Sequence, residues 1–161
     1  MDTSAIISLT HESLFAIVVF LLFLVFTIVR GRQSLINLIM GLYLALLVSV
    51  EFPYYDRLFG ESSTVGNKSI LMIAVFAMFT FAATFLFHRL MPKEYDEKAF
   101  ESFHKKLILA LLATALVMTY SYHVLPVTDL VDPGSPVQKL FAPEQNFFWW
   151  LILPLIALFF I

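Results

Sequence analysis

The sequence contains no cysteine and little charge, and both shortages exclude classes of protein. Without cysteine the 161 residues offer no disulfide framework, thiolate metal site or cysteine nucleophile. Charged residues make up 14% of the chain and the formal net charge is -2, so the basic face that a nucleic-acid partner requires is absent. The five glycines form no phosphate-binding loop, and no nucleophile elbow is present. The sequence therefore predicts no enzyme, no cofactor and no nucleic-acid partner.

Apolar residues are abundant instead. They make up 60% of the sequence, with a mean hydropathy of +0.88, whereas soluble domains use roughly 45–50% apolar residues. A soluble core of this size could not hide so much apolar surface. The composition therefore predicts a single membrane domain, residues 1–161, whose main partner is the lipid bilayer.

Uncharged runs predict an all-α, polytopic integral membrane bundle of five transmembrane helices. Each crossing needs ~20 mostly apolar residues, and the runs place the helices at about 13–29, 34–51, 70–88, 107–125 and 147–161. The fifth run gives only about 22 Å of helix against a ~30 Å hydrocarbon core. It is either a fifth span or a re-entrant tail, and its aromatic start favours a span. The proline-rich stretch 126–146 is expected to be extended and built around turns.

The polar segment 93–106 separates the third and fourth predicted spans. Glu94 with Lys98, and Glu101 with Lys105, are spaced four residues apart in the favourable order. This spacing predicts a short amphipathic helix on the cytoplasmic membrane surface. A solvated connector is the alternative, because such charge pairs contribute little stability.

The distribution of lysine and arginine predicts the orientation in the membrane. One side would carry Arg30, Arg32, Arg89, Lys93, Lys98, Lys105 and Lys106, and the other only Arg57, Lys68 and Lys139. Because basic residues are enriched on the cytoplasmic side, the first group marks that side. The amino terminus is therefore expected outside and the carboxyl terminus in the cytoplasm. The first residues carry no positively charged region of the kind that begins a secretory signal.

A stripe of small and polar residues follows one face of the second predicted helix. Asn37, Gly41, Ala45 and Ser49 recur every four residues and so line one side of that helix. Small residues allow helix backbones to approach closely in a bilayer, which favours a packing face that could also support self-association. The alternative is that Asn37 and Ser49 contact a ligand or ion, because polar groups at membrane depth are often functional.

A second group of polar residues is expected near the outer ends of the helices. Its members are His11, Glu12, Glu51, Tyr120 and His123, accompanied by Tyr54, Tyr55, Asp56 and Tyr122. Such residues could form a polar or ion site, but no metal-binding spacing links them, and an ordinary hydrated interfacial belt is the alternative. Glu51 ends the small-residue stripe and is expected to be partly desolvated, which would suit a proton carrier.

The run Arg30 to Leu46, an Arg-Gly turn followed by a helix with a small-residue face, resembles the second-helix region of the colicin V production protein (CvpA-like) family. The charged connector 93–106 is also similar. The resemblance implies a small bacterial inner-membrane protein and transfers no catalytic residue. Together with the composition, it predicts a non-enzymatic structural or assembly component of the bacterial cell membrane that associates with itself or with other membrane proteins. A small transporter or channel subunit with a proton or cation site near Glu51 is the alternative. An intramembrane or interfacial enzyme is the third hypothesis, and it would require the outer polar residues to converge.

Overall fold

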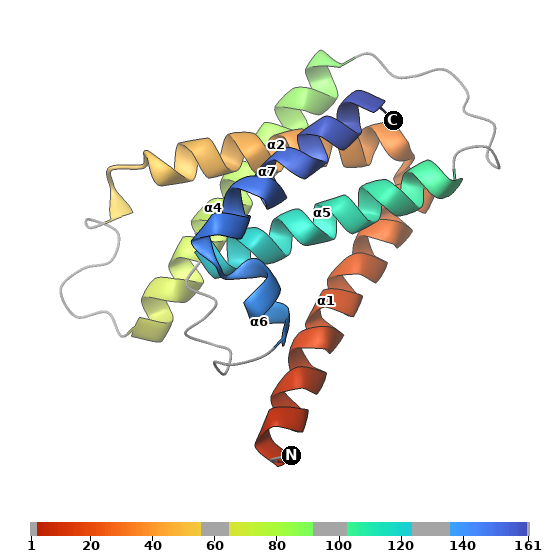
Figure 1. Ribbon diagram of the computed structural model, residues 1–161. Helices are drawn as coiled ribbons and strands as arrows, with labels where there is room; N and C mark the ends of the chain where they lie inside the picture. Colours follow the sequence, from red (N-terminus) through yellow and green to blue (C-terminus); the bar gives the residue numbers. More distant parts are fainter. Residues whose placement is uncertain (1–2, 56–64, 92–102, 124–135, 161) are drawn as a thin grey trace.

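A computed structural model (Figure 1) describes residues 3–55, 65–91, 103–123 and 136–160, and its regular elements there are all helices. They are α1 (Thr3–Arg30), α2 (Arg32–Val50), α4 (Val65–Leu90), α5 (Phe103–His123), α6 (Pro136–Phe141) and α7 (Glu144–Phe160). The prediction of an all-α protein is therefore confirmed for the described part of the chain.

Within the described ranges, three helices are long and apolar enough to cross a membrane. They are α2, the segment Asn67–Leu90 of α4, and α5, with 19, 24 and 21 residues. The apolar segment Leu14–Arg30 of α1 and the whole of α7 are shorter. The helices α1, α4, α5 and α7 all begin before the expected positions, because the polar residues that precede each apolar run contain no obligatory helix breaker.

A single residue, Gly31, separates α1 from α2. Its φ of 87° and ψ of 164° lie in a region that is almost restricted to glycine. The Gly31 amide donates to the Thr27 carbonyl at 2.9 Å, which closes the last turn of α1. The chain therefore turns sharply from α1 into α2 with almost no loop.

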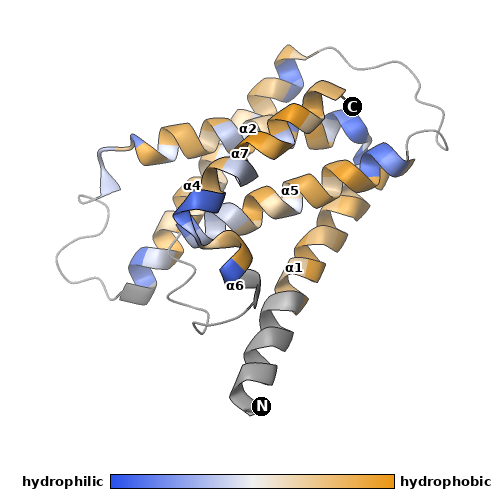
Figure 2. Ribbon diagram, viewed as in Figure 1, coloured by the Kyte–Doolittle hydropathy of each residue, from blue (hydrophilic) through white to orange (hydrophobic). Residues whose placement is uncertain are grey.

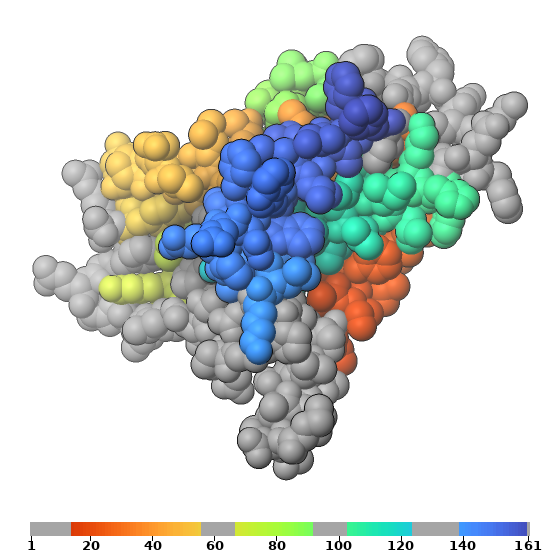
Figure 3. All heavy atoms as spheres, in the orientation of Figure 1, coloured from red at the N-terminus to blue at the C-terminus, as the bar shows by residue number. Residues whose placement is uncertain are grey.

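Helix α2 lies at the centre of the bundle and packs against α1, α4 and α5. Helix α4 runs antiparallel to it: Phe52 at the end of α2 contacts Phe79, with ring centroids 5.4 Å apart, and Gln33 at its start reaches Met91 at 3.4 Å. Helix α5 runs alongside α2 and packs also against α1 and α7. Figure 3 shows α7 covering part of this face of the molecule.

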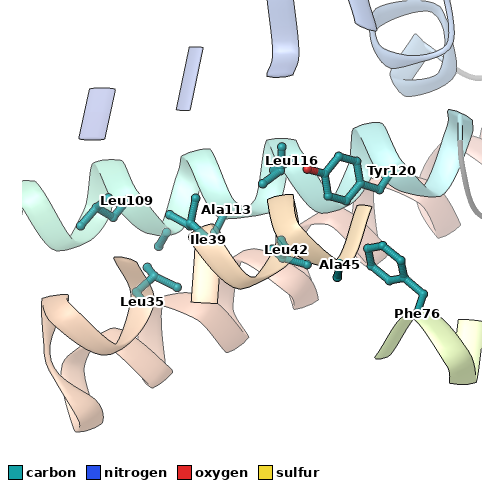
Figure 4. Packing of buried hydrophobic residues seen from close by; sticks show 10 residues of the cluster. Leu35, Ile39, Leu42, Ala45, Phe76, Leu109, Ala113, Leu116 and Tyr120 are labelled. Carbon is teal, nitrogen blue, oxygen red and sulfur yellow. The ribbon is translucent and has the colours of Figure 1, made fainter. Parts of the chain in front are cut away.

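The core lies mainly between α2 and α5. In Figure 4, Leu35 faces Leu109 at one end of this contact, and Ala45 lies near Tyr120 at the other, where Phe76 of α4 joins them. The two helices are therefore parallel. The buried residues of this cluster are Leu35, Ile39, Leu42, Ala45, Phe76, Leu109, Ala110, Ala113, Leu116 and Tyr120.

The two ends of the bundle differ in charge. The start of α2, the end of α4 and the start of α5 lie together, and these three helix ends carry Arg32, Arg89 and Lys105. Figure 2 shows hydrophilic residues at most helix ends, apart from the apolar carboxyl end of α7, and apolar residues along the helices between them. We call the end formed by the starts of α2 and α5 the basic end.

One predicted segment, 126–146, differs from the sequence-based prediction, and most of another, 93–106, lies outside the described residues. The stretch 126–146 was expected to be extended, but Pro136 opens the short helix α6, because the first helical position does not need an amide donor. Most of the connector 93–106 lies outside the described residues, and its last four residues form the first turn of α5. The structure therefore does not distinguish an amphipathic helix from a solvated connector.

Candidate functional site

The small-residue stripe predicted on α2 is wholly buried within the helical bundle. All four of its residues are buried: Asn37, Gly41, Ala45 and Ser49. Only 1% of the Asn37 surface is exposed. The residues on the neighbouring turns, Leu35, Ile39 and Leu42, form the core with α5. A second copy of the chain therefore has no access to this face while α4 and α5 remain packed on it.

Gly41 lies very close to Thr84 of α4 on this face. A Cβ atom placed on Gly41 would lie 2.9 Å from the Thr84 amide nitrogen and 3.1 Å from its Cα, and would meet Oγ1 at still shorter range. The Gly41 hydrogen that occupies the Cβ direction therefore points at Thr84 Oγ1, a geometry that recurs at helix crossings. Only glycine at position 41 permits this separation of the two backbones.

Asn37 and Ser49, the two residues considered as ligand contacts, have partners within the chain. Gln33 Nε2 donates to Asn37 Oδ1 at 3.2 Å, one turn earlier on the same helix. The Ser49 hydroxyl lies 2.8 Å from the Tyr55 hydroxyl, which follows the end of α2. These hydrogen bonds offset the cost of burying polar side chains, and they favour the packing role over the ligand role.

Hydroxyl groups elsewhere in the helices mostly bond to their own backbone. Thr27, Thr114, Thr119 and Ser121 each donate to the carbonyl four residues earlier, at 2.6 to 2.8 Å.

Thr80 makes the same kind of bond and donates to the Phe76 carbonyl at 2.9 Å. Thr84 does not: its buried Oγ1 has no hydrogen-bond partner in the described structure because it points at Gly41.

Of the residues predicted to form the outer polar site, Glu51, Tyr120 and His123 lie in the described part of the structure with their side chains. Glu51 follows the last residue of α2 and is exposed, not partly buried as expected. The side chains of His11 and Glu12, and the whole of Asp56, lie outside the described part of the structure. In the parts of the chain that are described, no three potential metal ligands lie close enough together to hold a metal ion.

Tyr120 and His123 have separate structural surroundings. The Tyr120 side chain is 1% exposed and packs edge-on against Phe76, with ring centroids 5.9 Å apart. Its hydroxyl has no hydrogen-bond partner in the described structure. His123 Nε2 lies 2.8 Å from the Phe141 carbonyl oxygen. The His123 ring packs against the Phe147 ring, with ring centroids 4.5 Å apart. Tyr120 thus belongs to the core, whereas His123 holds α6 and α7 against the end of α5.

Sequence reasoning missed one polar contact in the middle of the bundle. The Tyr43 hydroxyl on α2 donates to the Leu151 carbonyl on α7. Pro154, three residues later, is fully buried and lacks the amide that would donate to the carbonyl of Trp150, the residue just before Leu151. Neighbouring helices commonly supply polar partners where proline disturbs a membrane helix. The sequence contained two signals for this contact: the phenol of Tyr43 within one apolar run, and Pro154 within another.

The geometry describes a helix-packing site: a glycine crossing, paired polar groups and a tyrosine that bridges two helices. No protein-family model matches the chain, and comparison with characterised proteins and with solved structures finds no similar protein. The resemblance to the colicin V production protein family therefore stays a prediction.

Proposed function

We propose that this protein is a five-span integral membrane protein with a non-enzymatic structural or assembly role in the bacterial cytoplasmic membrane. The observation that carries membrane insertion is the apolar outer surface of the helices. Phe81 is 76% exposed, Phe85 61% and Leu22 64%. Soluble monomers rarely expose contiguous apolar patches of more than a few hundred Å², whereas lipid-facing surfaces are apolar throughout.

The five-span arrangement adds α1 and α7 to the three long helices. The 28 residues of α1 give about 42 Å of helix, enough to cross the bilayer. The 17 residues of α7 give about 25 Å, which a modest local thinning of the bilayer accommodates. Helix α7 covers part of the α2–α5 face and accepts the Tyr43 hydrogen bond in the middle of the bundle. Both contacts favour a membrane-spanning α7, as opposed to a re-entrant tail.

The basic end supports the orientation. Arg30, Arg32, Arg89, Lys105 and Lys106 all occupy helix ends on that side of the bundle. We assign it to the cytoplasm, with the amino terminus outside and the carboxyl terminus inside.

The hydrogen bonds of Asn37 and Ser49 to partners within the chain support a structural role. Polar residues that serve transport usually line a cavity or face one another deep in the membrane. Here Asn37 bonds to Gln33 and Ser49 bonds to Tyr55, while the exposed Glu51 lies at the end of α2. We infer that the chain acts by presenting a rigid helical surface to other membrane proteins or to a second copy.

Complementation of a strain that lacks the protein separates this role from transport. Glu51→Gln keeps the shape of the side chain and removes its charge, so we expect it to restore the phenotype fully. Gly41→Leu, which forces α2 and α4 apart, should fail at equal expression. Failure of Glu51→Gln with normal protein levels would support the transporter alternative and contradict the structural role.

A further inference from the structure

An apolar groove of about 400 Å³ lies between α2 and α4. Ala45 and Ala83 are buried at its base, and Ala82 also lines it, so three side chains that end at Cβ leave space between larger neighbours such as Leu86. The volume falls within the ~300–1,000 Å³ typical of small-molecule sites. Ala45, which lies one turn after Gly41, is the only member of the small-residue stripe that lines the groove.

The groove faces outward from the bundle. Among the described helices α4 packs mainly against α2, and Phe85, which also lines the groove, is 61% exposed. In a bilayer this surface meets lipid, because water is excluded from the hydrocarbon core. Atoms that line an empty groove lose dispersion contacts. A hydrocarbon chain is the available group that restores them.

The groove also has a charged end. Arg89, in the last turn of α4, contributes to its lining. Arg30 and Arg32 lie at the same end of the bundle, whereas the described carboxylates, Glu51 and Glu144, lie at the opposite end. A guanidinium binds phosphate through paired, charge-assisted hydrogen bonds. The end of the groove is therefore complementary to a phospholipid headgroup.

We propose that this groove binds one acyl chain of an anionic phospholipid and that Arg89 binds the phosphate of the same molecule. The proposal depends on the membrane insertion proposed above and adds a defined ligand to it. The acyl chain would contact the apolar lining, and the phosphate of the same lipid would bind Arg89 at the end of the groove. A second protein copy would satisfy the apolar lining but would leave Arg89 without an anion.

Native mass spectrometry of the detergent-purified chain, titrated with phosphatidylglycerol and with phosphatidylcholine, tests the site. The wild type should retain one phosphatidylglycerol in preference to phosphatidylcholine. Arg89→Gln should weaken phosphatidylglycerol binding about fivefold, since one basic group near anionic lipid contributes about that factor, and Arg89→Lys should restore most of the preference. Ala82→Phe, which fills the groove, should weaken binding of both lipids.

Two matched controls make the result specific. Ala77 is exposed on α4 outside the groove, so Ala77→Phe adds the same ring without filling it. Arg30→Gln removes one charge from the same end without touching the lining.

Equal phosphatidylglycerol affinity in Arg89→Gln, Ala82→Phe and the wild type would overturn the proposal. So would a dimer that Ala82→Phe abolishes, because a second copy would then occupy the groove. Either result leaves membrane insertion untouched, whereas a chain that stays soluble without detergent contradicts the proposed function itself.

Discussion

Replacing Gly41 with alanine tests the close crossing of α2 and α4, because two physical effects predict opposite signs. Alanine is favoured over glycine within a helix by about 0.8–1.0 kcal/mol, so propensity alone predicts stabilisation. The new Cβ, however, would lie 2.9 Å from the Thr84 amide nitrogen and 3.1 Å from its Cα. These are backbone atoms, so no side-chain rotation can relieve the contact.

The size of the effect follows from the movement that relief requires. Ordinary contact begins at 3.4 Å, so α4 must move by about 0.5 Å, the difference between 3.4 and 2.9 Å. A gap of that size forfeits about a quarter of the dispersion energy of each contact across the interface. Overpacking of this kind costs about 1–3 kcal/mol. After subtraction of the propensity gain, Gly41→Ala should be destabilised by about 1 kcal/mol and Gly41→Leu by about 2 kcal/mol.

Unfolding in mixed micelles with increasing SDS, followed by the fluorescence of Trp149 and Trp150, measures these differences. Thr84→Ala in the Gly41→Ala background serves as the matched control, because it removes the Oγ1 contact and should recover part of the loss. A Gly41→Ala variant about 1 kcal/mol more stable than the wild type, as propensity alone predicts, would refute the close crossing.

Three further substitutions have defined outcomes. Tyr43→Phe removes the hydrogen bond to the Leu151 carbonyl and should lower the free energy of unfolding by about 0.5–1.5 kcal/mol, whereas Tyr120→Phe removes a buried hydroxyl without a described partner and should be neutral or stabilising in the same SDS titration. Equal losses for both would contradict the assigned partners. Gly31→Ala, with no steric neighbour near the added Cβ but a φ of 87°, should lose about 1–3 kcal/mol through backbone strain alone, and an unchanged midpoint would exclude that backbone conformation. Glu51→Gln should unfold at the wild-type midpoint, because the carboxylate is exposed, and a large shift would indicate a buried, interacting group.

The sequence predicted the helical class and the face of α2 better than it predicted the partners of that face. The spacing of Gly41 and its neighbours follows from helical periodicity, which is a local property. The partner Thr84 lies 43 positions further along the chain, the difference between 84 and 41, and no local pattern identifies it.

Helix α5 shows the same limit more strongly. Leu111 is exposed and Leu112 is buried, although both are leucines in an apolar run. When lipid is as apolar as the core, hydrophobicity no longer distinguishes the outer face of a helix from the inner one. The Tyr43 hydrogen bond to α7 escaped prediction for a related reason, since it depends on where two helices cross.

The central claim is that the helices thread a membrane with the basic end in the cytoplasm. The absence of native cysteine allows a direct measurement, the labelling of single-cysteine variants in intact cells by a membrane-impermeant maleimide. Lys139 in α6 and Lys105 at the start of α5 are both exposed and lie at opposite ends of the bundle. We predict that Lys139→Cys is labelled in intact cells and that Lys105→Cys is labelled only after permeabilisation. Labelling of Lys105→Cys in intact cells, or equal protection of both variants, would contradict the account.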